Sequence, residues 1–144
     1  MFVVDTNILI YAVNRQSPFH GNCLAALNRW RVRAEPWHLT WGNCYEFLRA
    51  VTHRRGLMSP LSAEQAWQFL AALIASPGLN FLIPTDRHAA VLSGLLSEMP
   101  QLSGNIMHDV TIVVLMREYG IPTIYTHDAG FHRFAGIEVI DPVA

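Results

Sequence analysis

Short apolar runs alternate with longer helical segments along this chain, and this alternation constrains the fold more than any other feature. Runs that suit buried strands lie at Phe2–Val4, Trp37–Thr40, 80–83, 123–126 and 136–140. Parallel strands need long crossover connections, which are usually helices. The alternation therefore predicts an α/β fold with a central, mostly parallel five-stranded sheet flanked by helices.

The helical segments carry recognisable start and stop signals. Helices are expected at 8–13, from Ser17-Pro18 into the following arginines, at 43–53, and at 105–119 before Gly120. Ser62 and Gln65 have the spacing of a capping box, and Asp86 is placed to cap the next helix. No linker, repeat or low-complexity stretch interrupts the pattern, so residues 1–144 are expected to form one domain.

Composition narrows the class of protein. Of the 144 residues, 51% are apolar and 15% are charged, which is typical of a packed domain and leaves apolar surface for a dimer or partner protein. No apolar run reaches the ~20 residues of a membrane span, and the N-terminal segment carries Asp5 with no basic stretch before it. With Cys23 and Cys44 expected as free buried thiols, the sequence indicates a cytoplasmic protein without a membrane anchor.

All ten basic residues are arginine. The absence of lysine excludes a P-loop and a Schiff-base enzyme, since both need an amine. Arginines cluster at 29, 31 and 33 and again at 49, 54 and 55, which suits phosphate binding but equally suits a solvated helix face.

Four of the eleven acidic residues stand beside core-type segments: Asp5, Glu46, Asp109 and Asp128. The other seven are expected at caps, loops or helix surfaces; they are Glu35, Glu64, Asp86, Glu98, Glu118, Glu138 and Asp141.

A carboxylate among core residues is costly to desolvate unless a partner compensates its charge. No arginine lies within three positions of Asp5, Asp109 or Asp128. Asp5 and Asp128 follow predicted strands, at the sheet edge where α/β folds bind ligands. If the four acids converge, a divalent cation would relieve their repulsion, and oxygen ligands favour Mg²⁺ or Mn²⁺.

Each acid also has a simpler structural interpretation. Asp5 can be a helix N-cap, Glu46 a residue on a helix surface, and Asp109 a first-turn residue favoured by the helix dipole. Asp128 can be a turn residue before Ala129-Gly130.

His108 and His127 each precede one of these acids. Neighbouring residues in a helix or strand point to different faces, which argues against a direct catalytic role for either histidine. The chain has no pair of histidines four residues apart around a glutamate, so a zinc protease is unsupported.

These segments resemble the PIN-domain ribonucleases, specifically the VapC-type toxins of bacterial toxin–antitoxin pairs. The resemblance covers essentially the whole chain. It rests on the run from Val4 to Ala12 around Asp5-Thr6-Asn7, the segment 43–48 around Glu46, His108-Asp109, and the segment 120–128 that ends Thr126-His127-Asp128, with Phe131 after it.

The resemblance implies a PIN-like three-layer fold and a metal-dependent endoribonuclease that acts as a toxin. It implies that Asp5, Glu46, Asp109 and Asp128 bind Mg²⁺ or Mn²⁺, and that Thr6 or Asn7, together with Thr126, orient these acids. It further implies a homodimer, a cognate VapB-type antitoxin protein and an RNA substrate, which is tRNA, ribosomal RNA or mRNA.

Two other classes of function compete with this interpretation. A PIN-like module can serve only as a binding partner, but the complete set of four acids argues against that. A receiver or phosphatase domain is also rich in acids, but such domains use a lysine near the phosphoryl group and this chain has none.

Overall fold

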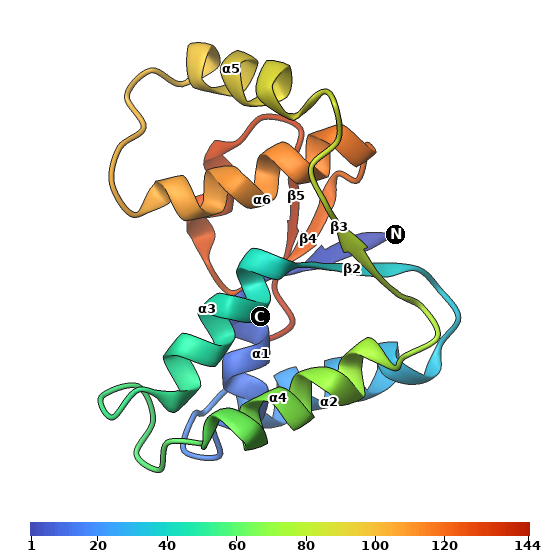
Figure 1. Cartoon of the computed structure of the whole chain (residues 1–144), viewed down its shortest axis with the longest axis vertical. Helices are drawn as coiled ribbons and strands as arrows, with labels where there is room; N and C mark the ends of the chain where they lie inside the picture. The colour runs from blue at the N-terminus through green and yellow to red at the C-terminus, as the bar shows by residue number, and fades with distance from the viewer.

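A computed structural model describes residues 1–144 and contains one five-stranded sheet in which every strand pair is parallel. Its strand order is β3-β2-β1-β4-β5 (Figure 1). The strands are β1 (Phe2–Val4), β2 (Trp37–Thr40), β3 (Leu79–Leu82), β4 (Thr123–Tyr125) and β5 (Glu138–Ile140). The predicted α/β class and parallel sheet are therefore confirmed.

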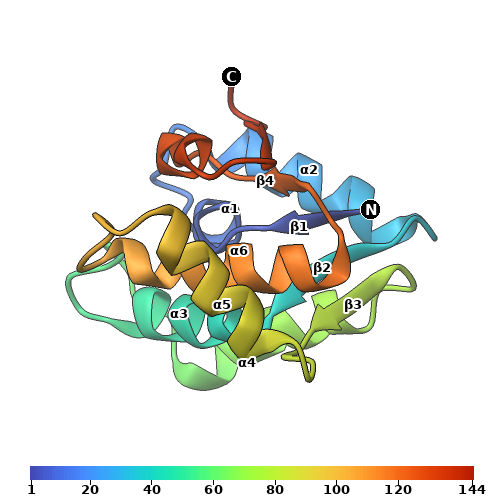
Figure 2. The ribbon, with the colours of Figure 1, turned by 90° about the horizontal axis from the view of Figure 1, so that it is seen from above.

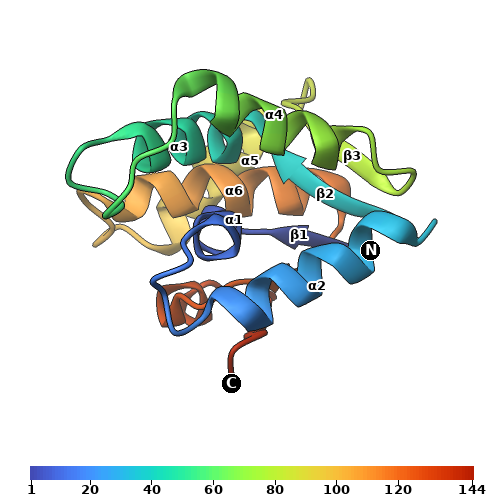
Figure 3. The same ribbon diagram turned by 90° about the horizontal axis from the view of Figure 1, so that it is seen from below.

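Helices cover both faces of this sheet, giving three layers. They are α1 (Thr6–Val13), α2 (His20–Val32), α3 (Trp41–Thr52), α4 (Ala63–Ile74), α5 (His88–Glu98), α6 (Ile106–Tyr119) and the short 3₁₀ helix η1 (Ala129–Arg133). Figures 1 and 2 show α5 and α6 on one side of the strands, and Figure 3 shows α2 and α4 from the opposite side. None of these helices is long and apolar enough to cross a membrane.

Each face of the sheet has its own apolar core. Phe2 and Val4 of β1 join a cluster with α1, α2, α3 and α4, whereas Val3 joins a second cluster with α5, α6 and η1. This division follows from the alternation of side chains along a strand. The two cores hold the carboxyl ends of β1, β2 and β4 together at one edge of the sheet, and the acidic residues lie at that edge.

Some predicted boundaries differ from the structure for local reasons. β5 begins at Glu138 because Gly136 has a φ of 79°, a left-handed conformation that does not fit a strand. α3 begins two residues earlier than predicted, because the Thr40 hydroxyl caps it by accepting from the Asn43 N–H. Asp86 does not cap α5, whose N-cap position is occupied by Arg87 without a side-chain hydrogen bond.

Other predicted signals are confirmed. Ser62 and Gln65 form a reciprocal capping box at the start of α4. Gly120 ends α6 in the left-handed conformation, with a φ of 65°. Cys23 and Cys44 are buried free thiols, as expected.

The prediction that Glu118 lies on a helix surface is wrong. Its side chain is fully enclosed and accepts hydrogen bonds from the Thr85 N–H at 2.8 Å, the Thr85 hydroxyl at 2.6 Å and His88 Nδ1 at 2.6 Å. The cause is that α5 and the loop before it fold over this side of α6 and bury most of its second half.

Candidate active site

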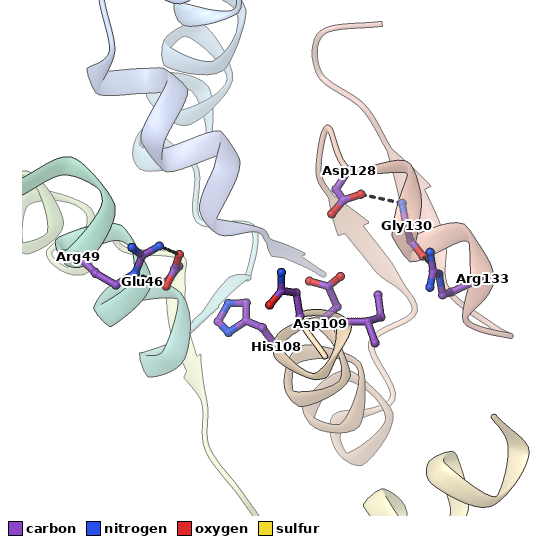
Figure 4. A pocket seen from close by; sticks show the side chains of 9 residues that line it. Glu46, Arg49, His108, Asp109, Asp128, Gly130 and Arg133 are labelled. Carbon is purple, nitrogen blue, oxygen red and sulfur yellow. Dashed lines mark hydrogen bonds and ion pairs between the residues drawn. The ribbon is translucent and has the colours of Figure 1, made fainter. Parts of the chain in front are cut away.

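A polar pocket opens at the carboxyl edge of the sheet, where α3, the start of α6 and η1 approach one another (Figure 4). Three of the four predicted acids, Glu46, Asp109 and Asp128, line it directly. The other residues of its wall are Arg49, Asn105, Ile106, His108, Gly130 and Arg133.

Asp5, the fourth acid, is 6% exposed and follows β1 directly. One of its oxygens accepts from the Thr6 N–H at 2.7 Å and the other accepts from the Thr126 hydroxyl at 2.7 Å. It is therefore the N-cap of α1, as its simpler interpretation proposed. Burial raises the pKa of Asp5, an effect that the two hydrogen bonds oppose and that the charge of Asp128 reinforces.

Thr126 connects the two ends of the chain at this site. Its hydroxyl donates to Asp5 and accepts from the Asn7 side-chain amide at 3.1 Å and from the Asp128 N–H at 2.9 Å. Asn7 Oδ1 in turn accepts from the His127 N–H at 3.4 Å. One buried hydroxyl therefore positions two of the acids relative to each other, although Thr126 and Asp5 lie 121 positions apart in the sequence.

Asn43 is a contributor that sequence reasoning missed. It is completely buried, and its amide donates to the Thr6 hydroxyl at 3.0 Å and to the Val4 carbonyl at 3.4 Å. Through these bonds Asn43 ties the start of α3 to the segment that carries Asp5. The available signal was a polar amide beside Cys44 and Phe47, three residues after a capping threonine.

Asp109 lies in the first turn of α6, at the centre of the pocket in Figure 4. Burial raises its pKa to about 6, and the negative charges of Asp5 and Asp128 contribute to the shift. Asp128 occupies the N-cap of η1, where its Oδ1 accepts from the Gly130 N–H at 2.7 Å. The three aspartates thus share one electrostatic environment.

Glu46 differs from these aspartates because it already has a cationic partner. Both its oxygens accept from Arg49, one turn further along α3, and this hydrogen bonding lowers the pKa of Glu46. Figure 4 shows this pair on one wall of the pocket, with Asp128 and Arg133 on the opposite wall. No three Asp, Glu, His or Cys side chains converge closely enough to form a ready-made metal site in this conformation.

The two histidines have different surroundings. His108 lines the pocket beside Asp109, although neighbouring helix residues were expected to face apart, because the first turn of α6 opens directly into the pocket. His127 lies outside the pocket wall. Its Nδ1 contacts Asp141 Oδ2 at 2.7 Å and its ring centroid lies 4.4 Å from that of Phe19, so it anchors the segment that follows β5.

Sequence comparisons assign this chain to a known family. The family model described as "PIN domain" matches residues 2–137. Ribonuclease VapC48 of Mycobacterium tuberculosis is 31% identical over 96% of this chain and 94% of its own length. Ribonuclease VapC37 of the same species is also 31% identical, over 100% of this chain and 99% of its own length.

Solved structures share the same fold at lower identity. A VapBC2 complex from Rickettsia felis bound to promoter DNA aligns with a TM-score of 0.66 at 18% identity, covering 97% of each chain. VapC20 of Mycobacterium tuberculosis, described as a toxin that cleaves the sarcin-ricin loop, aligns with a TM-score of 0.63 at 16% identity, over 96% of this chain and 99% of its own. The chain therefore belongs to the PIN-domain family, within the group of VapC ribonucleases.

Proposed function

We propose that this chain is a metal-dependent endoribonuclease that acts as the toxin of a toxin–antitoxin pair. The observation that carries the proposal is the group of Asp5, Asp109 and Asp128 at the carboxyl edge of the sheet. Burial raises the pKa of Asp109, and the charges of Asp5 and Asp128 add to that shift, in a pocket that Glu46 also lines. Such mutual repulsion creates a strong preference for a cation.

The donor set fits Mg²⁺ or Mn²⁺. Carboxylate oxygens are the ligands these ions prefer, and no cysteine lines the pocket to favour a softer metal. Asp5, Asp109 and Asp128 would hold the ion, with Glu46 completing the set. A bound divalent ion would polarise the phosphodiester and lower the pKa of the attacking water.

The chain's own residues prepare the site for this reaction. Thr126 and the Thr6 N–H orient the Asp5 carboxylate, and Asn43 holds Thr6 in turn. Asp109 faces the open pocket, where it is placed to orient a water or take its proton. His108 and Arg133 supply further polar groups on the walls, where a polyanionic substrate would lie.

The partners proposed here come from the family. Several structural relatives are described as VapBC complexes, which supports a VapB-type antitoxin protein as the partner of this chain. We propose RNA as the substrate, with tRNA, ribosomal RNA and mRNA as the candidate classes, and a homodimer as the assembly. The two free thiols suit the cytoplasm, where such an enzyme would meet its RNA.

The direct test uses purified protein, separated from any antitoxin, and a pool of total RNA. We expect discrete fragments with Mg²⁺ or Mn²⁺ and none with EDTA. Asp5→Asn and Asp109→Asn should each lower cleavage at least about 100-fold, because metal ligation and water activation are both affected.

Asp86→Asn is the matched control, since Asp86 is exposed and lies outside the pocket. It should cut RNA like the wild type. Cleavage that persists in EDTA, or that survives in both site variants, would refute the proposal. Folded protein that binds RNA without cutting any class of it would instead support a binding module.

A further inference from the structure

Arg49 and Glu46 form a fork-like pair on α3. Arg49 Nε donates to Glu46 Oε2 at 3.0 Å and Arg49 Nη2 donates to Oε1, so the guanidinium engages both carboxylate oxygens at once. This two-point geometry fixes the orientation of the guanidinium on the carboxylate. Among the four acids, only Glu46 forms an ion pair with an arginine.

The Arg49 side chain has no other hydrogen-bond partner in the structure. Arg133 donates to the Gly130 carbonyl, and Arg117 donates to Glu98 and to the Ala135 carbonyl. The Arg49 side chain, by contrast, is 64% exposed and bonds only to Glu46. An ion pair this exposed is weak, so Arg49 can leave Glu46 without breaking any other contact.

The pair conflicts with the use of Glu46 as a metal ligand. The oxygens of Asp5 accept single hydrogen bonds from neutral donors, which leaves lone pairs for a cation. Both oxygens of Glu46 are instead held by a positive charge that a divalent ion would repel. In this conformation the fourth acid is therefore closed to metal by the chain's own arginine.

We infer that Arg49 is an internal latch on Glu46: a divalent cation displaces the guanidinium, which then becomes available at the rim of the pocket for an RNA phosphate. The guanidinium fork suits phosphate oxygens as well as carboxylate oxygens. Loading of the metal and capture of the substrate would thus be coupled through one side chain. The first half of this inference is the displacement of Arg49 from Glu46 by a cation. The second half is the binding of an RNA phosphate by the released Arg49, and it rests on the proposed nuclease function.

The first half is tested by calorimetric titration of the RNA-free protein with Mn²⁺. Arg49→Gln should bind Mn²⁺ about two- to fivefold more tightly than the wild type, which is the strength of an exposed ion pair expressed as a ratio. Arg133→Gln is the matched control. It removes the same charge from the same pocket, but Arg133 forms no hydrogen bond or ion pair with an acid and acts on Asp109 only through its field.

A double-mutant cycle separates competition at Glu46 from a general field effect. In the Glu46→Gln background, Arg49→Gln should leave Mn²⁺ affinity unchanged, because the latched carboxylate is gone. The latch is overturned if Arg49→Gln does not tighten binding, if Arg133→Gln tightens it equally, or if the gain persists without Glu46.

The second half is tested with a single-stranded RNA that the wild type cuts. Arg49→Gln should raise KM about tenfold through loss of a charged hydrogen bond, with a smaller change in kcat, and Arg49→Lys should recover part of it. The slope of log KM against log salt should fall by about 0.7, the value for one lost phosphate contact. Arg15→Gln, an exposed control outside the pocket and outside both arginine clusters, should change neither.

An unchanged KM and salt slope in Arg49→Gln would overturn the phosphate role. If the chain cuts no RNA, the proposed function fails, while the Mn²⁺ titrations still decide whether Arg49 competes with a cation.

Discussion

Two effects act in opposite directions on the negative charge of Asp109, one from its own helix and one from the surrounding fold. Its place in the first turn of α6 favours a negative charge through the helix dipole. Burial nevertheless raises its pKa to about 6, and the fields of Asp5 and Asp128 add to that shift. In the absence of a cation, the ionised form of Asp109 therefore destabilises the fold at neutral pH.

We predict that Asp109→Asn stabilises the cation-free protein at pH 7.5. The pKa rises from 3.8 in the reference state to about 6, and after allowance for partial solvation this corresponds to about 1 kcal/mol in the free energy of unfolding. The sign follows from proton uptake. Between these two pKa values the folded state holds the proton that the unfolded state has lost, so wild-type stability falls as pH rises through this window.

Urea unfolding in EDTA at pH 4 and pH 7.5 measures the effect. The advantage of Asp109→Asn over the wild type should be present at pH 7.5 and largely gone at pH 4, whereas Asp86→Asn should show none. Equal stability of Asp109→Asn and the wild type at pH 7.5 would contradict the burial argument.

At the scale of elements, a small polar cluster joins α5 to α6. Glu118 is the only charged side chain buried in α6, and Thr85 and His88 supply three hydrogen bonds to it. Arg87 adds a bond from its guanidinium to the Glu118 carbonyl. The start of α5 is thus fixed by side chains rather than by a helix cap of its own.

We predict that Glu118→Ala lowers the free energy of unfolding by about 3 kcal/mol, because it leaves Thr85 and His88 without their acceptor. Hydrogen exchange should accelerate first at residues 83–90. Glu98→Gln is the control: it removes the carboxylate of an exposed ion pair with Arg117 and should cost less than about 1 kcal/mol. A similar loss of stability in both variants would show that the Glu118 cluster contributes no more than an exposed ion pair.

For the whole molecule, the framework is built on two apolar cores rather than on the candidate active site. Large apolar clusters fill both faces of the sheet, and the acids lie at its edge, outside both clusters. We therefore expect the fold not to need a cation, unlike small domains that are held together by metal.

We predict that protein treated with EDTA stays folded, with an unchanged far-ultraviolet circular dichroism spectrum. Mn²⁺ at about 100 times its Kd should add about 2.7 kcal/mol, which raises Tm by about 5–10 °C in a chain of this size. Asp109→Asn should lose most of this shift. Unfolding in EDTA, or an equal Tm shift in the variant, would contradict this view.

Local chemistry in the sequence determined most of the elements and singled out four acids, three of which line one pocket in the structure. Several features depend only on neighbours a few residues apart and can be predicted from the sequence alone. They are the strand runs, the Ser62 capping box and the left-handed Gly120. The Arg49–Glu46 pair could also have been predicted, since the two residues lie three positions apart on one helix, but the sequence analysis did not consider it.

Contacts between distant segments were decided only by the tertiary structure. Asn43 meets Thr6 across 37 positions, Thr126 meets Asp5 across 121, and Glu118 meets His88 across 30. The physical reason is that periodicity specifies which face of an element is buried, but not which side chain of another element it meets. Packing of the two cores brings those partners together, and it places Glu46, Asp109 and Asp128 around one pocket while Glu46 stays paired with Arg49.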